Sequence, residues 1–90
     1  MHYFPNHVVT VVEAEIAAIK STLARPEGED VSRMARQRAA SMLTRGEIES
    51  HEYPSAVIGQ ARDLLIEDRR KGGPAWCVFR QEWRVRVLQA

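Results

Sequence analysis

The stretch WCVFRQEWRVRV, residues 76–87, decides which fold the sequence predicts. It follows a break at Gly72, Gly73 and Pro74 and is rich in Trp, Val and Phe, which are enriched in β-strands. Its end, RVRV, alternates with the period of two that is typical of a strand. Because residues 75–88 are too many for one ordinary strand, we expect a β-hairpin that turns near residues 80–82.

The register of this hairpin stays open between two arrangements. With a three-residue loop, Phe79 faces Trp83 across the hairpin. With a two-residue loop, Phe79 instead faces Arg84, and Trp76 joins the core face. Both registers turn Arg84 and Arg86 away from the core, beside one aromatic ring. The hairpin is therefore predicted to have an apolar inner face and an outer face of arginine and aromatic side chains.

Three helices are predicted before the hairpin. Apolar residues spaced by three and four indicate a first helix over residues 10–24. Asp30 is a candidate N-cap for a second helix that ends near Gly46, and Pro54 suits the first turn of a third. Arg38 falls within the apolar stripe of the second helix, so its guanidinium must extend to solvent or meet a carboxylate.

The predicted fold class is α+β, with three helices packed on a small antiparallel sheet that the C-terminal hairpin forms. The segment HVVTV, residues 7–11, is a possible short N-terminal strand of the same sheet, because Val and Thr are β-branched. No repeat, low-complexity tract or long linker divides the chain, so residues 1–90 are expected to form a single compact domain.

Composition places this domain in the cytoplasm and outside the membrane. The chain has 90 residues, 44% of them hydrophobic and 28% charged, with a formal net charge of +1, as in an ordinary globular protein. Its single cysteine, Cys77, cannot form an intramolecular disulfide, which favours a reducing compartment. No apolar run approaches the roughly 18 residues that span a bilayer.

The sequence offers no constellation of catalytic or ligand-binding residues. It has no glycine-rich phosphate loop before a helix and no nucleophile-elbow serine. The group of Glu49, His51 and Glu52 lacks a second spaced pair of metal ligands, and Cys77 is expected to be a small buried residue. We therefore predict that the protein is not an enzyme and has no catalytic residue, cofactor or metal.

Binding to another protein is the function that remains by exclusion. The expected role is that of an adaptor, an inhibitor or an assembly subunit, for which an inhibitor encoded by a phage or mobile element has a suitable size. Arginine and aromatic residues are frequent at protein-binding hot spots, although the same arginines can also form a merely solvated face. A homodimer could use the same surfaces. The candidate partner-binding residues are Gly59, Ile66, Arg70, Trp76, Phe79, Arg80, Arg84 and Arg86.

The alternative function is nucleic-acid binding. Three helices followed by a hairpin is the order of elements in a winged helix, which this chain resembles in element order only. The third helix mixes acidic and basic residues, which phosphates would partly repel, so the second helix and the hairpin are the expected contacts. The candidate residues for this alternative are Arg33, Arg36, Gln37, Arg84 and Arg86.

Overall fold

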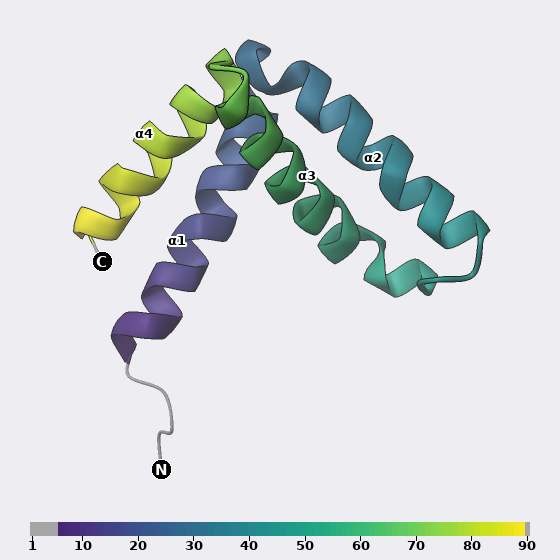
Figure 1. The fold of residues 1–90 in the computed structure, drawn as a ribbon. Helices are drawn as coiled ribbons and strands as arrows, with labels where there is room; N and C mark the ends of the chain where they lie inside the picture. The colour runs from purple at the N-terminus through teal and green to yellow at the C-terminus, as the bar shows by residue number, and fades with distance from the viewer. Residues whose placement is uncertain (1–5, 90) are drawn as a thin grey trace.

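Residues 6–89 form an all-helical structure whose helices make two arms (Figure 1). The computed structural model describes the backbone of residues 6–89 and the side chains of residues 11–89. Residues 6–89 contain no β-strand. The elements are the helices α1 (Asn6–Leu23), α2 (Glu29–Thr44), α3 (Tyr53–Arg70) and α4 (Pro74–Gln89), and the short 3-10 helices η1 (Pro26–Gly28) and η2 (Ser50–Glu52).

The predicted α+β fold is wrong because the stretch that was interpreted as a hairpin is helix α4. Trp76, Phe79 and Trp83 are separated by three and four residues, which places all three rings on one side of a helix. Pro74 suits the first turn, and residues 80–82 lack the Gly or Asn that a tight hairpin turn requires. Strand propensity spans only about 1 kcal/mol and depends on packing partners, so burial of the aromatic side decides the outcome.

The predicted N-terminal strand is also wrong, because α1 begins at Asn6 and includes residues 7–11. A strand needs a neighbouring strand to pair its backbone N–H and C=O groups. Once residues 76–87 are helical, no such neighbour exists among residues 6–89. A helix satisfies the same groups internally, so the β-branched residues of this segment continue the first helix.

Glycines end α2 and α3 where the sequence predicts. Gly46 and Gly72 have φ values of 73° and 67°, in the left-handed region that glycine adopts without steric cost. The N–H of Glu47 donates to the Met42 carbonyl at 2.9 Å, and that of Gly73 to the Asp68 carbonyl at 2.9 Å. These are Schellman motifs, which stop each helix within one residue.

The corner between α3 and α4 is fixed by Asp68. Its Oδ2 accepts a hydrogen bond of 2.9 Å from the backbone N–H of Trp76, in the first turn of α4. A Cβ on Gly73 would lie 2.0 Å from Asp68 Oδ1, so glycine leaves room for this carboxylate. The side chain therefore closes the C-terminal end of one helix onto the N-terminal end of the next and places Trp76 beside the last turn of α3.

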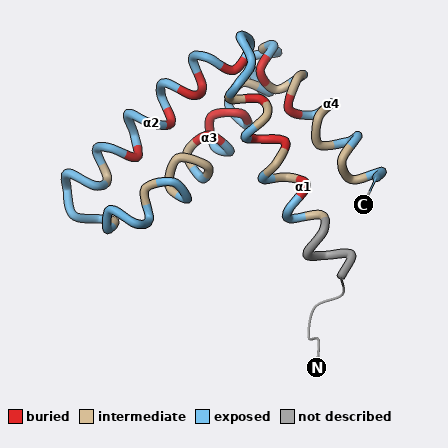
Figure 2. Tube along the Cα trace, turned by 180° about the vertical axis from the view of Figure 1, so that it is seen from behind, coloured by how far each residue is buried: buried red, intermediate tan, exposed pale blue. Residues whose placement is uncertain are grey.

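The arms consist of α1 with α4 and of α2 with α3, and they meet where α3 joins α4 (Figure 1). The molecule measures 38 × 37 × 21 Å, so it is about two helix diameters thick. Its radius of gyration is 14.1 Å, against about 12 Å for a compact domain of this length. Buried residues are concentrated near the apex and along the helix pairs (Figure 2). One core joins all four helices and consists of Ala18, Ile19, Val31, Ala35, Ala61, Leu64, Leu65, Ala75 and Phe79.

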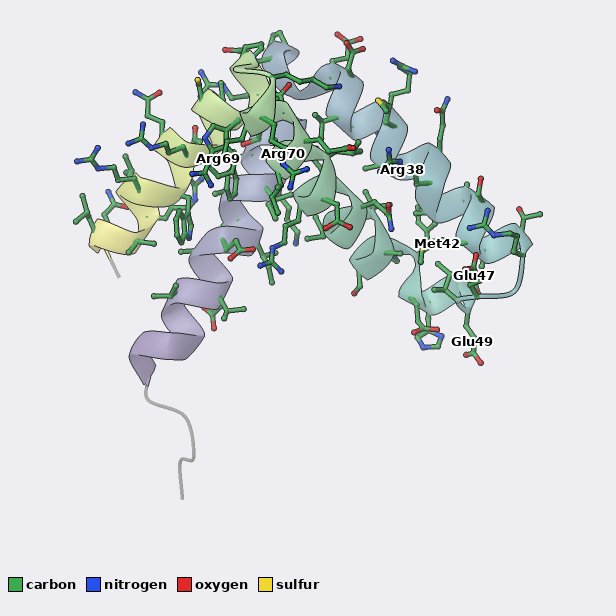
Figure 3. All side chains as sticks on the ribbon, viewed as in Figure 1. Arg38, Met42, Glu47, Glu49, Arg69 and Arg70 are labelled. Carbon is green, nitrogen blue, oxygen red and sulfur yellow. The ribbon has the colours of Figure 1, made fainter. Side chains whose placement is uncertain are left out.

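The structure confirms the prediction that the Arg38 guanidinium reaches solvent or a carboxylate. Its side chain is partly exposed on α2, and its Nη2 lies 3.8 Å from Oε2 of Glu67 on α3 (Figure 3). The guanidinium both reaches solvent and meets a carboxylate, so the apolar stripe of α2 is not interrupted by an unpaired buried charge. Within the described part of the chain, no helix is long and apolar enough to cross a bilayer.

Candidate functional site

Three aromatic rings of α4 lie together at its contact with α3 and α1. The ring centroids of Trp76 and Phe79 are 5.4 Å apart with planes inclined at 47°. Those of Phe79 and Trp83 are 6.2 Å apart with nearly parallel planes, at 5°. Phe79 is buried in the core, while Trp76 and Trp83 are half-buried beside it. Such pairs contribute about 0.5 to 1.5 kcal/mol beyond burial, so the rings are held rigidly.

These rings line a cavity of about 220 Å³, here called the aromatic pocket. Its apolar wall is completed by Leu65 and by Ile66, a residue that is 40% exposed. Ile66 departs from the apolar pattern of α3 in the sequence, and in the structure it faces this pocket rather than the core. The full lining is Glu15, Arg62, Leu65, Ile66, Arg69, Trp76, Phe79 and Trp83.

Arginine side chains form the edge of the aromatic pocket. The guanidinium carbon of Arg69 lies 5.3 Å from the centroid of the Trp76 ring, which is cation–π geometry. Arg62 Nε lies 3.0 Å from Glu15 Oε1, and this ion pair joins α3 to α1 across the pocket. Arg80 lines a neighbouring depression together with Arg69 and the two tryptophans. The pocket thus combines an apolar interior with a mainly basic edge.

Trp83 has a polar group that the fold leaves unused. Its indole Nε1 is buried and has no hydrogen-bond acceptor among the described residues. A buried donor without an acceptor costs about 1 to 3 kcal/mol, so the pocket wall is locally less stable than a fully satisfied one.

Positive charge accumulates from the last turn of α3 along α4 as far as Arg84. Among the described side chains, five cations there have no carboxylate within ion-pair distance. Arg69 and Arg70 are in the last turn of α3, where they also interact favourably with the helix dipole (Figure 3). A ligand that approaches the aromatic pocket therefore meets uncompensated positive charge. The five are Arg69, Arg70, Lys71, Arg80 and Arg84.

The structure brings together only part of the predicted partner-binding set. Ile66, Trp76 and Phe79 line the aromatic pocket, and Arg80 lies next to it. Arg84 lies one turn beyond Arg80 on α4 and lines a further depression that also includes Arg80 and Trp76. The remaining predicted residues, Gly59, Arg70 and Arg86, do not line the pocket.

Arg86 forms an ion pair with Glu82 and is not free to bind a partner. Glu82 accepts hydrogen bonds from Arg86 and, at 2.9 Å, from Arg25, which follows α1. The bond from Arg86 lowers the pKa of Glu82 below its ordinary value of 4.5, partial burial opposes the shift, and the bond from Arg25 adds to it. The network holds α4 against the end of α1.

The Glu82 network makes stability depend on pH. Because the pKa of Glu82 is lower in the folded protein than in the unfolded chain, its contribution is complete above about 4.5 and is lost as the pH falls through the folded value. We expect Glu82→Gln to lower the free energy of unfolding at neutral pH, and the gap from wild type to shrink in acid. Urea unfolding at a series of pH values measures this gap, and a constant gap would contradict the assignment.

The residues predicted for nucleic-acid binding do not form one surface. Its expected wing is helix α4, so the winged-helix likeness does not hold. Arg33 is bonded to Asp30 at 3.1 Å, while Arg36 and Gln37 are exposed on α2. Helices α2 and α4 lie on different arms (Figure 1), so these residues and Arg84 do not face one ligand together.

The remaining candidates from the sequence are the possible metal ligands near residue 50 and Cys77. Glu49, His51 and Glu52 are exposed within 4.8 Å of one another near the far end of the α2–α3 arm (Figure 3). Glu49 and Glu52 form the capping box of η2, with Glu49 N–H donating to Glu52 Oε1 at 2.9 Å. Cys77 is exposed on α4, so the prediction that it is buried is wrong.

Sequence reasoning missed five residues of the pocket: Trp83, Arg69, Leu65, Arg62 and Glu15. Trp83 was placed opposite Phe79 in one hairpin register, although its spacing of four from Phe79 and seven from Trp76 is the helical signal that groups all three rings. No local signal identifies the others, because α1 and α3 are brought beside α4 only by the tertiary fold.

Comparison with known proteins finds no matching family model, no matching curated protein and no matching solved structure. The function of this protein must therefore be inferred from the chemistry of its own side chains.

Proposed function

We propose that this protein acts by binding another protein, and that the aromatic pocket with its basic edge is the contact surface. The observation behind the proposal is that Ile66, Trp76 and Trp83 surround one cavity while Arg69 and Arg80 stand beside it. Tryptophan and arginine dominate the binding energy of many protein interfaces. The role is that of an adaptor, inhibitor or assembly subunit without chemistry of its own.

The pocket defines the chemistry of the partner. A cavity of about 220 Å³ accepts one large aliphatic or aromatic side chain, and the rings around it are already packed against one another. Little side-chain freedom is lost on binding, which favours affinity. The unpaired arginines favour carboxylates on either side of the side chain that enters the cavity. The expected partner segment therefore has Asp or Glu residues next to a Leu, Phe or Trp.

Nucleic-acid binding remains the alternative, and the pocket geometry argues against it. Single-stranded nucleic acid requires aromatic faces on which bases can stack. Arg69 already lies over one face of Trp76, and Phe79 stacks on Trp83. A net charge of +1 also gives little long-range attraction for a polyanion.

A cytoplasmic location is part of the same proposal. Cys77 is an exposed thiol with no second cysteine in the chain. A reducing compartment keeps such a thiol from forming disulfides with other proteins.

Selection of displayed random peptides on the immobilised protein tests this function. We expect enrichment of segments with acidic residues around a large apolar one. Ile66→Asp should weaken a selected peptide by about thirtyfold, or about 2 kcal/mol, because a carboxylate then occupies the pocket wall. The matched control is Met34→Asp on α2, because Met34 is 36% exposed against 40% for Ile66. Titration calorimetry measures both affinities.

Two results would contradict the proposal. One is a selected peptide that binds Ile66→Asp and the wild type equally. The other is the absence of any selected peptide together with tight binding to an oligonucleotide that weakens steeply with salt, which would favour the nucleic-acid alternative.

A further inference from the structure

A second surface lies inside the angle between the arms. There α1 and α3 border a groove of about 560 Å³, here called the inner-angle groove. Val12 and Ile16 of α1 are exposed on one side of it, and Ile58 of α3 lies on the other. The full lining is Val12, Glu15, Ile16, Ile19, Lys20, Pro54, Ser55, Ile58, Gly59 and Arg62. We propose that this groove is where a second copy of the chain binds, with its own α3 packed against Gly59.

Gly59 has no role within the single chain that requires glycine. It lies in the interior of α3 with a negative φ, and a Cβ built on it would meet no atom within 4 Å. Glycine at such a position disfavours the helix relative to alanine. A helix backbone from outside the chain, approaching closely over Gly59, accounts for the missing side chain.

The charge of the groove is compatible with a second copy as the occupant. The inner-angle groove contains the Glu15–Arg62 ion pair at 3.0 Å and one further cation, Lys20, so it is close to neutral. Two copies can therefore face each other here without strong repulsion. The last turn of α3 and the adjoining length of α4 have five unpaired cations among the described side chains, so two copies facing each other there would repel.

In the proposed pair the two copies are related by a twofold axis. In a twofold interface the same patch is used by both copies, and a residue on the axis meets its own equivalent. With Gly59 on the axis, the two α3 helices cross at their narrowest points. The exposed Val12 and Ile16 of each copy then border the crossing and lose contact with water. The groove adjoins the aromatic pocket at the Glu15–Arg62 ion pair, but Ile16 and Gly59 line only the groove, and the pairing does not depend on the proposed function.

Size-exclusion chromatography with light scattering, from low to several hundred micromolar protein, tests the pairing. We expect the wild type to form a dimer and Ile16→Asp to be monomeric throughout. Gly59→Ala should raise Tm at low protein concentration, because alanine favours the helix. The same variant should weaken the dimer by about tenfold or more, because its methyl group separates the two backbones. A higher Tm together with a weaker dimer is the result expected of a glycine at an interface. A glycine outside the interface would raise Tm on substitution without weakening the dimer.

The matched control is Ile66→Asp, because Ile66 and Ile16 are 40% and 39% exposed on different surfaces. Ile66→Asp should dimerise as the wild type does, and Ile16→Asp should bind the selected peptide as the wild type does. A wild type that is monomeric at every concentration would overturn the pairing and leave the groove to a helix of another protein. Dimers of Ile16→Asp and Gly59→Ala as tight as those of the wild type would overturn it as well.

Discussion

Replacing Leu65 by alanine is expected to lower the free energy of unfolding by about 3 kcal/mol. Leu65 is 1% exposed and belongs to the core where the four helices meet. It also lines the aromatic pocket, so its removal leaves a void that only partly collapses. Because a domain of this size is stable by about 5 to 15 kcal/mol, the loss is a large fraction of the total. Urea unfolding followed by circular dichroism measures it.

The control is the same substitution at Leu43, which is 37% exposed on α2. Leu43→Ala should change stability by no more than about 0.5 kcal/mol, since little area leaves the core. A loss below about 1 kcal/mol for Leu65→Ala would show that the apex is not a core shared by the four helices.

Gly28→Ala is expected to destabilise the protein by about 2 to 3 kcal/mol, although it adds one methyl group. A Cβ at Gly28 would lie 2.0 Å from the carbonyl oxygen of Thr22 and 2.8 Å from its carbonyl carbon. Both are backbone atoms at the end of α1, and Thr22 is itself fully buried. The turn from α1 to α2 must therefore move away from the core. Thermal and urea unfolding measure the loss.

Gly59→Ala is the matched control for this prediction. The chemical change is the same, but a Cβ at Gly59 meets nothing within 4 Å. At concentrations where the chain is monomeric, this variant should gain about 0.5 to 1 kcal/mol. Equal effects of the two substitutions would show that η1 does not approach the end of α1 closely.

The sequence predicted the first three helices because their signals are local. Apolar spacing of three and four, Pro54 near the start of α3, and glycines after α2 and α3 each act within a few residues. Arg38 was predictable for the same kind of reason, since a charge in an apolar stripe must find a carboxylate or solvent.

Helix α4 was mispredicted because two signals in the same residues conflict. Trp, Val and Phe favour a strand by type, while the positions of Trp76, Phe79 and Trp83 favour a helix by spacing. The three-residue-loop hairpin and the helix both place Phe79 beside Trp83. Only the helix adds Trp76 to the same side and makes a pocket wall from the three rings.

The sequence by itself therefore determined that three helices precede residue 72, that α2 and α3 end at glycines, and that no catalytic constellation is apparent. It did not determine where the first two helices begin, because α1 starts at Asn6 and Asp30 lies inside α2 rather than at its N-cap. Only the tertiary structure decided which surfaces exist. The cation–π contact of Arg69 with Trp76 and the ion pair of Glu15 with Arg62 form because the helices fold back on one another. The corner between α3 and α4, which Asp68 closes, is one place where they do so. Such contacts depend on how helices cross, which is set by burial summed over the whole chain rather than by any local pattern.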